Sequence, residues 1–439
     1  MVNVLNYLKN QTQGNFKIYM MPIILGIFFT QKISIGGEFY VGELIALIFI
    51  FINLGRIVLD SKEKILVLFA FLWSFAQLAS DIINNTYWLD SIKGIFAPVF
   101  FVATILLLVH VKKYSFKLFP SFLIGILIGG LVEIFFSSYQ VVIDNPWKWG
   151  LGGTILSFFL LYASFFEQPK MSTLIIFMLL FMIVSLSFGG RSLALFPLMA
   201  LILFNAGRKA TSEINLSLSK SFKYFIIVCF FVFILNIFFT LIFSSDLILS
   251  YFDDAAKNKY KIQSGGEFGF LLGGRSEILA SFKAFIDKPF LGHGSWAKDN
   301  GMYIDYMQRL LSELKYESLG SDKSLEFGQD LIPVHSFIMG GFVWAGFFGG
   351  LFWIVFLFTY LNIFLNKLRF LPLYFYNGTL VFVWNIFFSP FGSSNRFGTA
   401  IFIGCFFSYI NFLESKKLTY ENQHRDYFFQ SGEISSSMH

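Results

Sequence analysis

The chain has 439 residues, of which 56% are hydrophobic and only 14% charged, and its mean hydropathy is +0.67. About a quarter of the residues of an ordinary soluble domain are charged, so this composition excludes a single soluble globule and predicts an integral membrane protein. The net charge of +6 is spread over segments between apolar runs, which does not indicate a nucleic-acid-binding surface.

Apolar runs recur along the whole chain, and about 20 apolar residues are enough to cross the hydrocarbon of a bilayer. The fold class expected is therefore an all-α polytopic membrane protein with about 12 transmembrane helices, within a range of about 10–13. The expected spans are 18–30, 39–59, 65–80, 92–111, 118–136, 149–166, 172–188, 192–206, 222–244, 335–364, 371–389 and 397–413.

These spans divide the chain into four parts. Residues 1–244 hold about nine transmembrane helices, 245–334 form one large loop, 335–413 hold about three more helices, and 414–439 form a polar tail. Composition predicts that the tail is disordered. Lys and Arg are concentrated in alternate short loops, which predicts that both termini are cytoplasmic and the large loop external.

Two amphipathic helices are expected in the large loop, lying over the outer mouth of the bundle. The first begins near Ser276 as N-cap and stops at Lys288-Pro289, with an apolar face of Ile278, Leu279, Phe282, Phe285 and Ile286. The second ends near Gly320 and has an apolar face of Met302, Tyr306, Met307, Leu310, Leu311 and Leu314.

Arg275 follows Gly273-Gly274 at the start of the first of these helices. Free N–H groups at a helix start, a permissive glycine pair and a guanidinium together favour binding of a phosphate or diphosphate. The alternative is an arginine that pairs with a loop carboxylate such as Glu277, or one that is simply solvated.

His335 follows Pro333 where the loop re-enters the bundle. A neutral histidine at this place can act as a general base toward a hydroxyl; the alternative is an interfacial histidine that only packs or caps. His293, in the sequence GHGSW, is the weaker candidate because its glycines argue first for a tight turn.

Arg191 and Arg396 each follow a small-residue turn in a short external link, FGGR and SPFGSSNR. Ionised groups this close to hydrocarbon are costly unless they have partners. Each arginine therefore either binds an anionic substrate group or extends toward lipid headgroups. Carboxylates near outer span ends that could serve as partners are Glu133, Asp81 and Glu43. Cys229 and Cys405 lie inside apolar runs, which argues against a redox or thiolate metal site.

Three motifs stand in order along the second half of the chain: FGGR at 188–191, GGRSEILASFKAFIDKPFLGHGSW at 273–296, and PVHSFIMGGFVWAGFFGG at 333–350. They resemble the bacterial O-antigen ligase and O-antigen polymerase superfamily of polytopic glycosyltransferases. The matching features are a Gly-Arg that opens the helix of the large loop, a P-h-h-G-x-G turn, a His-Ser at the loop's end and a Gly-x-x-Gly in the next span. The motifs cover about residues 190–350, and the first half agrees only in hydropathy.

This resemblance implies a class C glycosyltransferase-like fold in a bacterial inner membrane and a role in lipopolysaccharide biosynthesis. The implied reaction transfers a glycan from undecaprenyl diphosphate to an acceptor hydroxyl at the periplasmic face, with inversion and without a metal or other cofactor. Arg191 and Arg275 would bind the diphosphate, and His335 would act as base. Arg396 could bind a second phosphate, although the resemblance itself implies no role for it. Partners would be the lipid-linked oligosaccharide or polysaccharide, an acceptor glycan or lipid A–core, and a chain-length regulator.

Ligase and polymerase share donor and motifs, and the sequence does not separate them. A rival reading is a lipid-linked oligosaccharide flippase or transporter with a similar number of spans. A flippase is expected to have charges along a central cavity and short loops. Here few charged residues fall within the spans, and most polar residues lie in one long loop, which favours the enzyme. A structural membrane protein with a sensory loop would leave the pattern of arginine, glycine and histidine unexplained.

Overall fold

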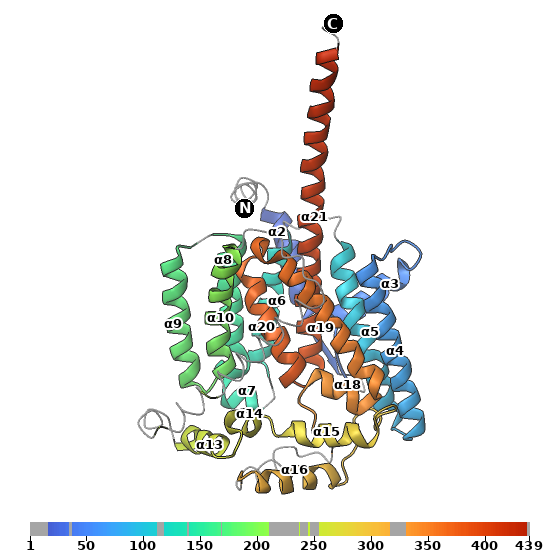
Figure 1. Ribbon diagram of the computed structural model, residues 1–439, viewed down its shortest axis with the longest axis vertical. Helices are drawn as coiled ribbons and strands as arrows, with labels where there is room; N and C mark the ends of the chain where they lie inside the picture. Colours follow the sequence, from blue (N-terminus) through green and yellow to red (C-terminus); the bar gives the residue numbers. More distant parts are fainter. Residues whose placement is uncertain are drawn as a thin grey trace.

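The structure is a computed structural model, and it is mostly helical (Figure 1). It describes residues 16–34, 37–111, 118–137, 140–167, 169–209, 237, 245, 254–316 and 331–436. The expected span 222–244 lies outside these residues except for Ile237, and so does the part of the loop at 317–330. Each of the other expected spans contains helix.

The first half of the chain forms helices joined by short links, with one small β-hairpin. Its elements are α2 (Phe16–Phe29), β1 (Lys32–Ser34), β2 (Glu38–Tyr40), α3 (Val41–Ile52), α4 (Ser61–Ile83), α5 (Trp88–His110), α6 (Phe119–Phe135), α7 (Gln140–Asp144), the π-turn η3 (Trp147–Leu151), α8 (Gly152–Phe165), α9 (Met171–Ser187) and α10 (Arg191–Arg208). The β1 and β2 strands pair antiparallel, with Ile33 opposite Phe39.

The described residues of the second half begin with helices of the large loop and end with helices that return to the bundle. They are α13 (Asp254–Ser264), α14 (Gly269–Gly273), α15 (Glu277–Asp287), α16 (Met302–Glu313), α18 (Phe337–Ala345), α19 (Phe347–Lys367), the 3₁₀ turn η4 (Leu368–Phe370), α20 (Leu373–Phe388) and α21 (Ser393–Ser436).

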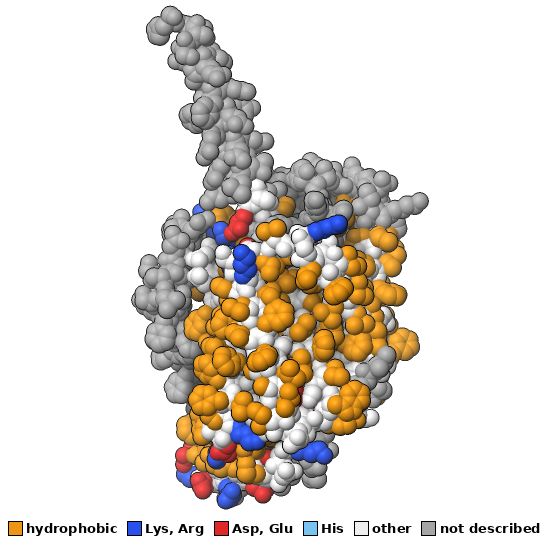
Figure 2. Space-filling model, turned by 90° about the vertical axis from the view of Figure 1, so that its right-hand side faces the viewer, with side chains coloured by type: hydrophobic (Ala, Val, Ile, Leu, Met, Phe, Trp, Pro, Cys, Tyr) orange, Lys and Arg blue, Asp and Glu red, His pale blue; other side chains and the backbone are white. Residues whose placement is uncertain are grey.

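Hydrophobic side chains cover the flank of the bundle, with charged side chains toward its two ends (Figure 2). Among the described residues, four helical stretches are long and apolar enough to cross a membrane: Ser61–Ile83, Trp88–His110, Phe347–Phe370 and Ser393–Ser415. Shorter apolar helices, such as Phe119–Phe135 and Met171–Ser187, lie beside them. The chain is therefore a helical membrane protein.

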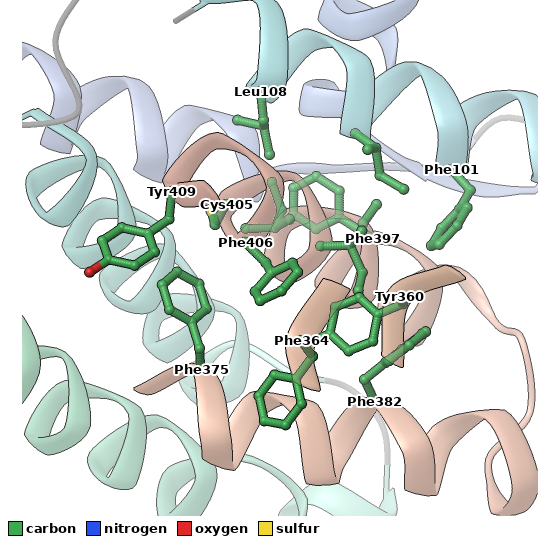
Figure 3. Packing of buried hydrophobic residues seen from close by; sticks show 14 of the residues in the cluster. Phe101, Leu108, Tyr360, Phe364, Phe375, Phe382, Phe397, Cys405, Phe406 and Tyr409 are labelled. Carbon is green, nitrogen blue, oxygen red and sulfur yellow. The ribbon is translucent and has the colours of Figure 1, made fainter. Parts of the chain in front are cut away.

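Aromatic side chains fill the centre of the bundle. Phe101 of α5 lies 5.3 Å from Trp353 of α19 between ring centroids, and both rings are fully buried. Farther along, Phe375 of α20 packs against Phe406 and Tyr409 of α21 (Figure 3). Large buried aromatic surfaces stabilise such a core by dispersion and edge-to-face contact. The 20% aromatic content thus builds the interior as well as the lipid-facing surface.

The expected span 335–364 is not one continuous helix. It divides at Gly346, which has a positive φ of 66°, into α18 and α19. A Cβ at this position would lie 2.2 Å from the carbonyl oxygen of Phe290, which follows α15. The break therefore exists because the loop packs its backbone directly against the start of α19, and only glycine fits there.

The GHG turn of the loop is held by the same contact. Gly292 and Gly294 have positive φ, and a Cβ on Gly292 would lie 2.6 Å from the carbonyl oxygen of Trp344. The backbone N–H of His293 donates to Val343 O at 2.7 Å, and that of Gly294 donates to Trp344 O at 3.1 Å. The glycine motifs on the two sides of this contact are thus packing motifs that fix the loop on α18 and α19.

Helices α15 and α16 lie across one end of the bundle, opposite the end from which α21 extends (Figure 1). Both helices were expected, but the buried face of α15 differs from the expected one. Its buried residues are Glu277 and the small Ala280, Ser281 and Ala284. Of the expected apolar face, Leu279 and Phe285 are half-buried and pack inward, whereas Ile278, Phe282 and Ile286 are exposed. Small residues allow α15 to approach α18 and α16 closely, and this turns the larger side chains outward. Ser276 is the N-cap residue, although its side chain makes no capping hydrogen bond.

Helix α16 ends at Glu313 and buries Tyr303, Met307 and Leu311, so Met302 falls on its exposed side. At the other end of the molecule, α21 continues through the polar tail to Ser436, whereas composition predicted no regular structure there.

Candidate functional site

Arg275 lies in the link between α14 and α15. A Cβ on Gly273 would lie 2.2 Å from the carbonyl oxygen of Gln263, so this glycine lets the link pack tightly on α13. The Arg275 guanidinium lies over the ring of Trp384 from α20, at 5.6 Å from its centroid, and Nη1 donates to Gly274 O at 3.1 Å. Its Nε is buried and has no acceptor among the described residues.

The charged form of Arg275 is held in partly desolvated surroundings. Burial lowers the pKa of this guanidinium, while the nearby Glu277 carboxylate raises it. A cation kept in such surroundings interacts strongly with any anion that reaches it, because few water molecules screen the interaction.

Arg191 is the first residue of α10, directly after the Gly189-Gly190 turn, in which Gly189 has a positive φ of 70°. Its Nη2 donates to Gln263 Oε1 at 2.8 Å, and its guanidinium lies 5.3 Å from the centroid of the Tyr260 ring. Both partners belong to α13 of the loop, so the side chain contacts protein here rather than extending to headgroups. The Arg191 and Arg275 guanidinium groups are near enough to repel each other.

His335 lies at the other edge of this region, immediately before α18. The next residue, Ser336, caps that helix by accepting a hydrogen bond from Met339 N at 3.2 Å, and its hydroxyl donates to Ile386 O at 2.8 Å. His335 Nδ1 is 3.9 Å from Glu277 Oε1. The imidazole is about one-third exposed, whereas the Glu277 carboxylate is buried.

Glu277 connects the two halves of the site, since it acts electrostatically on Arg275 and pairs with His335. The sequence indicated this residue only as a neutralising partner of Arg275. Its position two residues after that arginine, in the first turn of a helix, was the available signal. Gln263, Tyr260 and Trp384 were not found at all, because their segments meet only in the folded chain.

The sequence predicted free N–H groups at the start of α15 as part of the anion site, and the structure differs on this point. The N–H groups of Ile278 and Leu279 at the start of α15 donate to the carbonyl oxygens of Arg275 and Ser276, at 3.2 and 3.0 Å. These donors are thus used within the first turn. Anion binding at this place would rest on the two guanidinium groups rather than on the helix N-terminus.

Arg396 lies elsewhere, in α21 after the link from α20. Its Nε and Nη2 donate to the two carboxylate oxygens of Glu43, at 2.7 and 2.9 Å, and both residues are buried. The guanidinium also lies 5.6 Å from the Phe100 ring centroid. Because its charge is already matched by a bidentate carboxylate, we leave Arg396 out of the site.

The remaining candidates also have structural partners. His293 Nε2 lies 2.9 Å from Ala284 O, and burial lowers the pKa of its imidazole, which favours a neutral ring that ties the GHG turn to α15. Asp81 accepts hydrogen bonds from the N–H and hydroxyl of Ser295, at 2.6 and 2.9 Å, and so holds the same turn on α4. Glu133 pairs with Lys32 at 2.6 Å.

A mainly apolar cavity lies at the far end of α4, between that helix, α5, α19 and α21. Asp60 and Glu63 at its rim are about 30 Å of helix away from the end of α4 that contacts the loop. The cavity therefore does not belong to the arginine site. Within the described residues, no three His, Cys, Asp or Glu side chains are grouped so that they could bind a metal ion.

Comparison with known proteins adds no relative: no family model matches the chain, and neither a curated protein nor a solved structure matches it.

Proposed function

We propose that the protein is an integral-membrane glycosyltransferase of the O-antigen ligase and polymerase type. In this proposal it transfers a glycan from undecaprenyl diphosphate to an acceptor hydroxyl. The observation that supports it best is the cluster of Arg191, Arg275, Glu277 and His335. These residues come from three separate segments and combine two desolvated cations with a carboxylate–imidazole pair.

Each residue type suits one step of such a transfer. Arg191 and Arg275 would bind the donor diphosphate and stabilise the charge that develops on it as the leaving group. The acceptor oxygen would attack the anomeric carbon from the side opposite the diphosphate, so that the new C–O bond forms as the bond to phosphate oxygen breaks. The configuration at that carbon would therefore invert.

The acceptor proton needs a base during this attack. His335 would take it on Nε2, because Nδ1 faces Glu277. The Glu277 carboxylate would stabilise the resulting imidazolium, as an acidic partner does for a histidine base. The Tyr260 and Trp384 rings under the two guanidinium groups would keep water from the leaving group.

In this proposal the protein lies in a bacterial inner membrane, with loop helices α13 to α16 on the periplasmic side and both termini in the cytoplasm. This orientation is supported by the excess of Lys and Arg in the loops expected on the cytoplasmic side. There the cluster would face the compartment in which lipid-linked glycans are assembled, and the acceptor would be either a second lipid-linked unit or lipid A–core.

The test is a gel profile of surface polysaccharide from a deletion strain, complemented with wild type, Arg275→Ala or His335→Ala. Lipid A–core with a single repeat unit in the deletion would identify a polymerase. Bare core with polymer on the lipid carrier would identify a ligase. Under the proposal, both variants are present in the membrane at wild-type levels and reproduce the deletion phenotype.

Three results would overturn this assignment. Full complementation by either variant would remove that residue from the reaction. An unchanged ladder in the deletion strain would refute a role in O-antigen assembly. Donor accumulation on the cytoplasmic face would instead favour a flippase.

A further inference from the structure

Helix α15 presents its large apolar side chains outward. Ile278, Phe282 and Ile286 are spaced four residues apart, and 42%, 55% and 54% of their respective surfaces are exposed. Residues at this spacing form a line along one side of a helix. We call these three residues the α15 stripe. The side that packs on α18 and α16 has the small Ala280, Ser281 and Ala284 at its centre, with Phe285 against Phe342 of α18.

The stripe continues into apolar surface that belongs to the transmembrane bundle. Phe290 and Leu291, directly after α15, are 77% and 43% exposed. The neighbouring Lys288 donates from Nζ to Asn84 Oδ1 at 2.6 Å, which fixes this segment at the end of α4. On α4 itself Ile82 and Ile83 are 67% and 58% exposed.

The apolar side of α4 runs back from this point along the helix. Its exposed large residues are Ile65, Leu68, Phe71, Leu72, Phe75, Leu78, Ile82 and Ile83. They belong to the hydrophobic flank of the bundle, where Figure 2 shows hydrophobic side chains between two charged ends. An isolated exposed leucine or phenylalanine needs no explanation, but a continuous surface of this length does.

The position of α16 shows which side of the loop helices α15 and α16 faces away from the bundle. Helix α16 lies farther from the bundle than α15 does (Figure 1), and its exposed residues include Asp305, Arg309 and Glu313. The polar helix thus faces outward, whereas the apolar stripe lies beside the end of the bundle.

We propose that the α15 stripe is embedded in the acyl–headgroup boundary of the membrane leaflet at the loop end of the bundle. The occupant of this surface is lipid, because the stripe adjoins the hydrophobic flank of α4, and the Lys288–Asn84 hydrogen bond at the junction is the kind of polar contact that lies at headgroup level. An in-plane helix of this kind binds through its apolar face. Since α15 begins two residues after Arg275, the lipid contact also sets the depth of Arg275 and Glu277 relative to the bilayer.

Fluorescence quenching in nanodiscs tests this placement on the full-length protein. A single cysteine is introduced as Phe282→Cys in a Cys229→Ser/Cys405→Ser background and labelled with an environment-sensitive fluorophore. The control is Arg309→Cys, on the exposed side of α16. The label at position 282 is expected to be quenched by phosphatidylcholine with a nitroxide high on its acyl chain, and to be severalfold less quenched by aqueous iodide than the label at 309.

Two results would overturn the proposal. Equal iodide quenching at both positions would mean that the stripe faces water. Shielding at 282 from both quenchers would mean that protein covers it, for example a second copy of this chain. The unsubstituted chain supplies an independent measurement with a lipid that carries a diazirine high on its acyl chain. Photolabelling is expected on the α15 peptide and not on the α16 peptide, and the reverse would refute the lipid contact.

Discussion

Arg396 and Arg275 look alike in the sequence, since each follows a turn of small residues near the same expected face of the membrane. The fold treats them differently. Arg396 forms a bidentate pair with the buried Glu43, at 2.7 and 2.9 Å. Arg275 lies over an aromatic ring, with a buried Nε that has no acceptor within the described residues. One arginine thus has a bidentate carboxylate partner, and the other does not have one among the described residues.

Under the proposed function, this comparison separates a structural arginine from one that would bind the donor diphosphate. Both are desolvated, so burial alone does not decide between them. The partner decides, because a carboxylate with both oxygens engaged leaves no reason for a second anion to bind. Arg191 lies close enough to Arg275 for the two guanidinium groups to repel each other.

The largest effect is expected from Arg396→Met. This change leaves the fully buried Glu43 without its cation, which costs about 3–5 kcal/mol in the free energy of unfolding. Thermal unfolding of the purified protein in detergent measures the loss. The double variant Glu43→Gln/Arg396→Met is expected to regain most of it, because no uncompensated charge remains. A double variant that is stable but inactive in glycan transfer would return Arg396 to the site.

Arg275→Ala is expected to produce the opposite result. Glycan transfer should fall by about 10²–10³ in kcat, as when a main donor to the developing charge is removed. Thermal stability should change less than in Arg396→Met, because the removal of a desolvated cation offsets the loss of its attraction to the buried Glu277 carboxylate. The matched control is Arg309→Ala on the exposed side of α16, with both readouts at wild-type level. A large stability loss in Arg275→Ala would make this arginine structural, like Arg396.

Gly346→Ala tests the contact between the loop and the bundle. A Cβ here meets Phe290 O at 2.2 Å on a backbone with positive φ, so the free energy of unfolding should fall by about 1–3 kcal/mol. Proteolysis within the loop should become faster as well. The control is Gly130→Ala in α6, where nothing lies within 4 Å of the added atom. Equal behaviour of the two variants would refute the close packing.

Much of the fold follows from one-dimensional patterns. Apolar runs predicted where helices lie because a bilayer requires long apolar segments, and the 3.6-residue period located α15 and α16. The same period did not predict which side of α15 is buried. Large apolar residues are normally assigned to a core, but beside a membrane the small face of a helix can be the buried one, and this choice depends on tertiary packing.

The sequence predicted the arginines and the histidine of the candidate site, but not the residues that contact them. Arg191, Arg275 and His335 stand out because a cation or an imidazole at a helix start beside glycines is chemically unusual. Gln263, Tyr260 and Trp384 are ordinary residues on α13 and α20 whose importance comes from proximity alone. The glycines of the GHG turn and of the α18–α19 break drew attention for a similar reason, although their role is close backbone contact.

Glu277→Gln is the smallest change and the one that tests the pairing inside the site. The carboxylate lies 3.9 Å from a partly exposed imidazole, so the pair is worth roughly 1 kcal/mol, or about a fivefold loss in kcat with little change in KM. Without the carboxylate, the imidazolium formed during proton transfer is less stable. The acid limb of the pH–rate profile should therefore move to lower pH, which a merely structural role of Glu277 would not cause. Glu313→Gln, at the exposed end of α16, serves as the control for removal of a negative charge from the loop. An equal loss at every pH, or a rise in KM alone, would mean that Glu277 supports Arg275 and donor binding instead of His335.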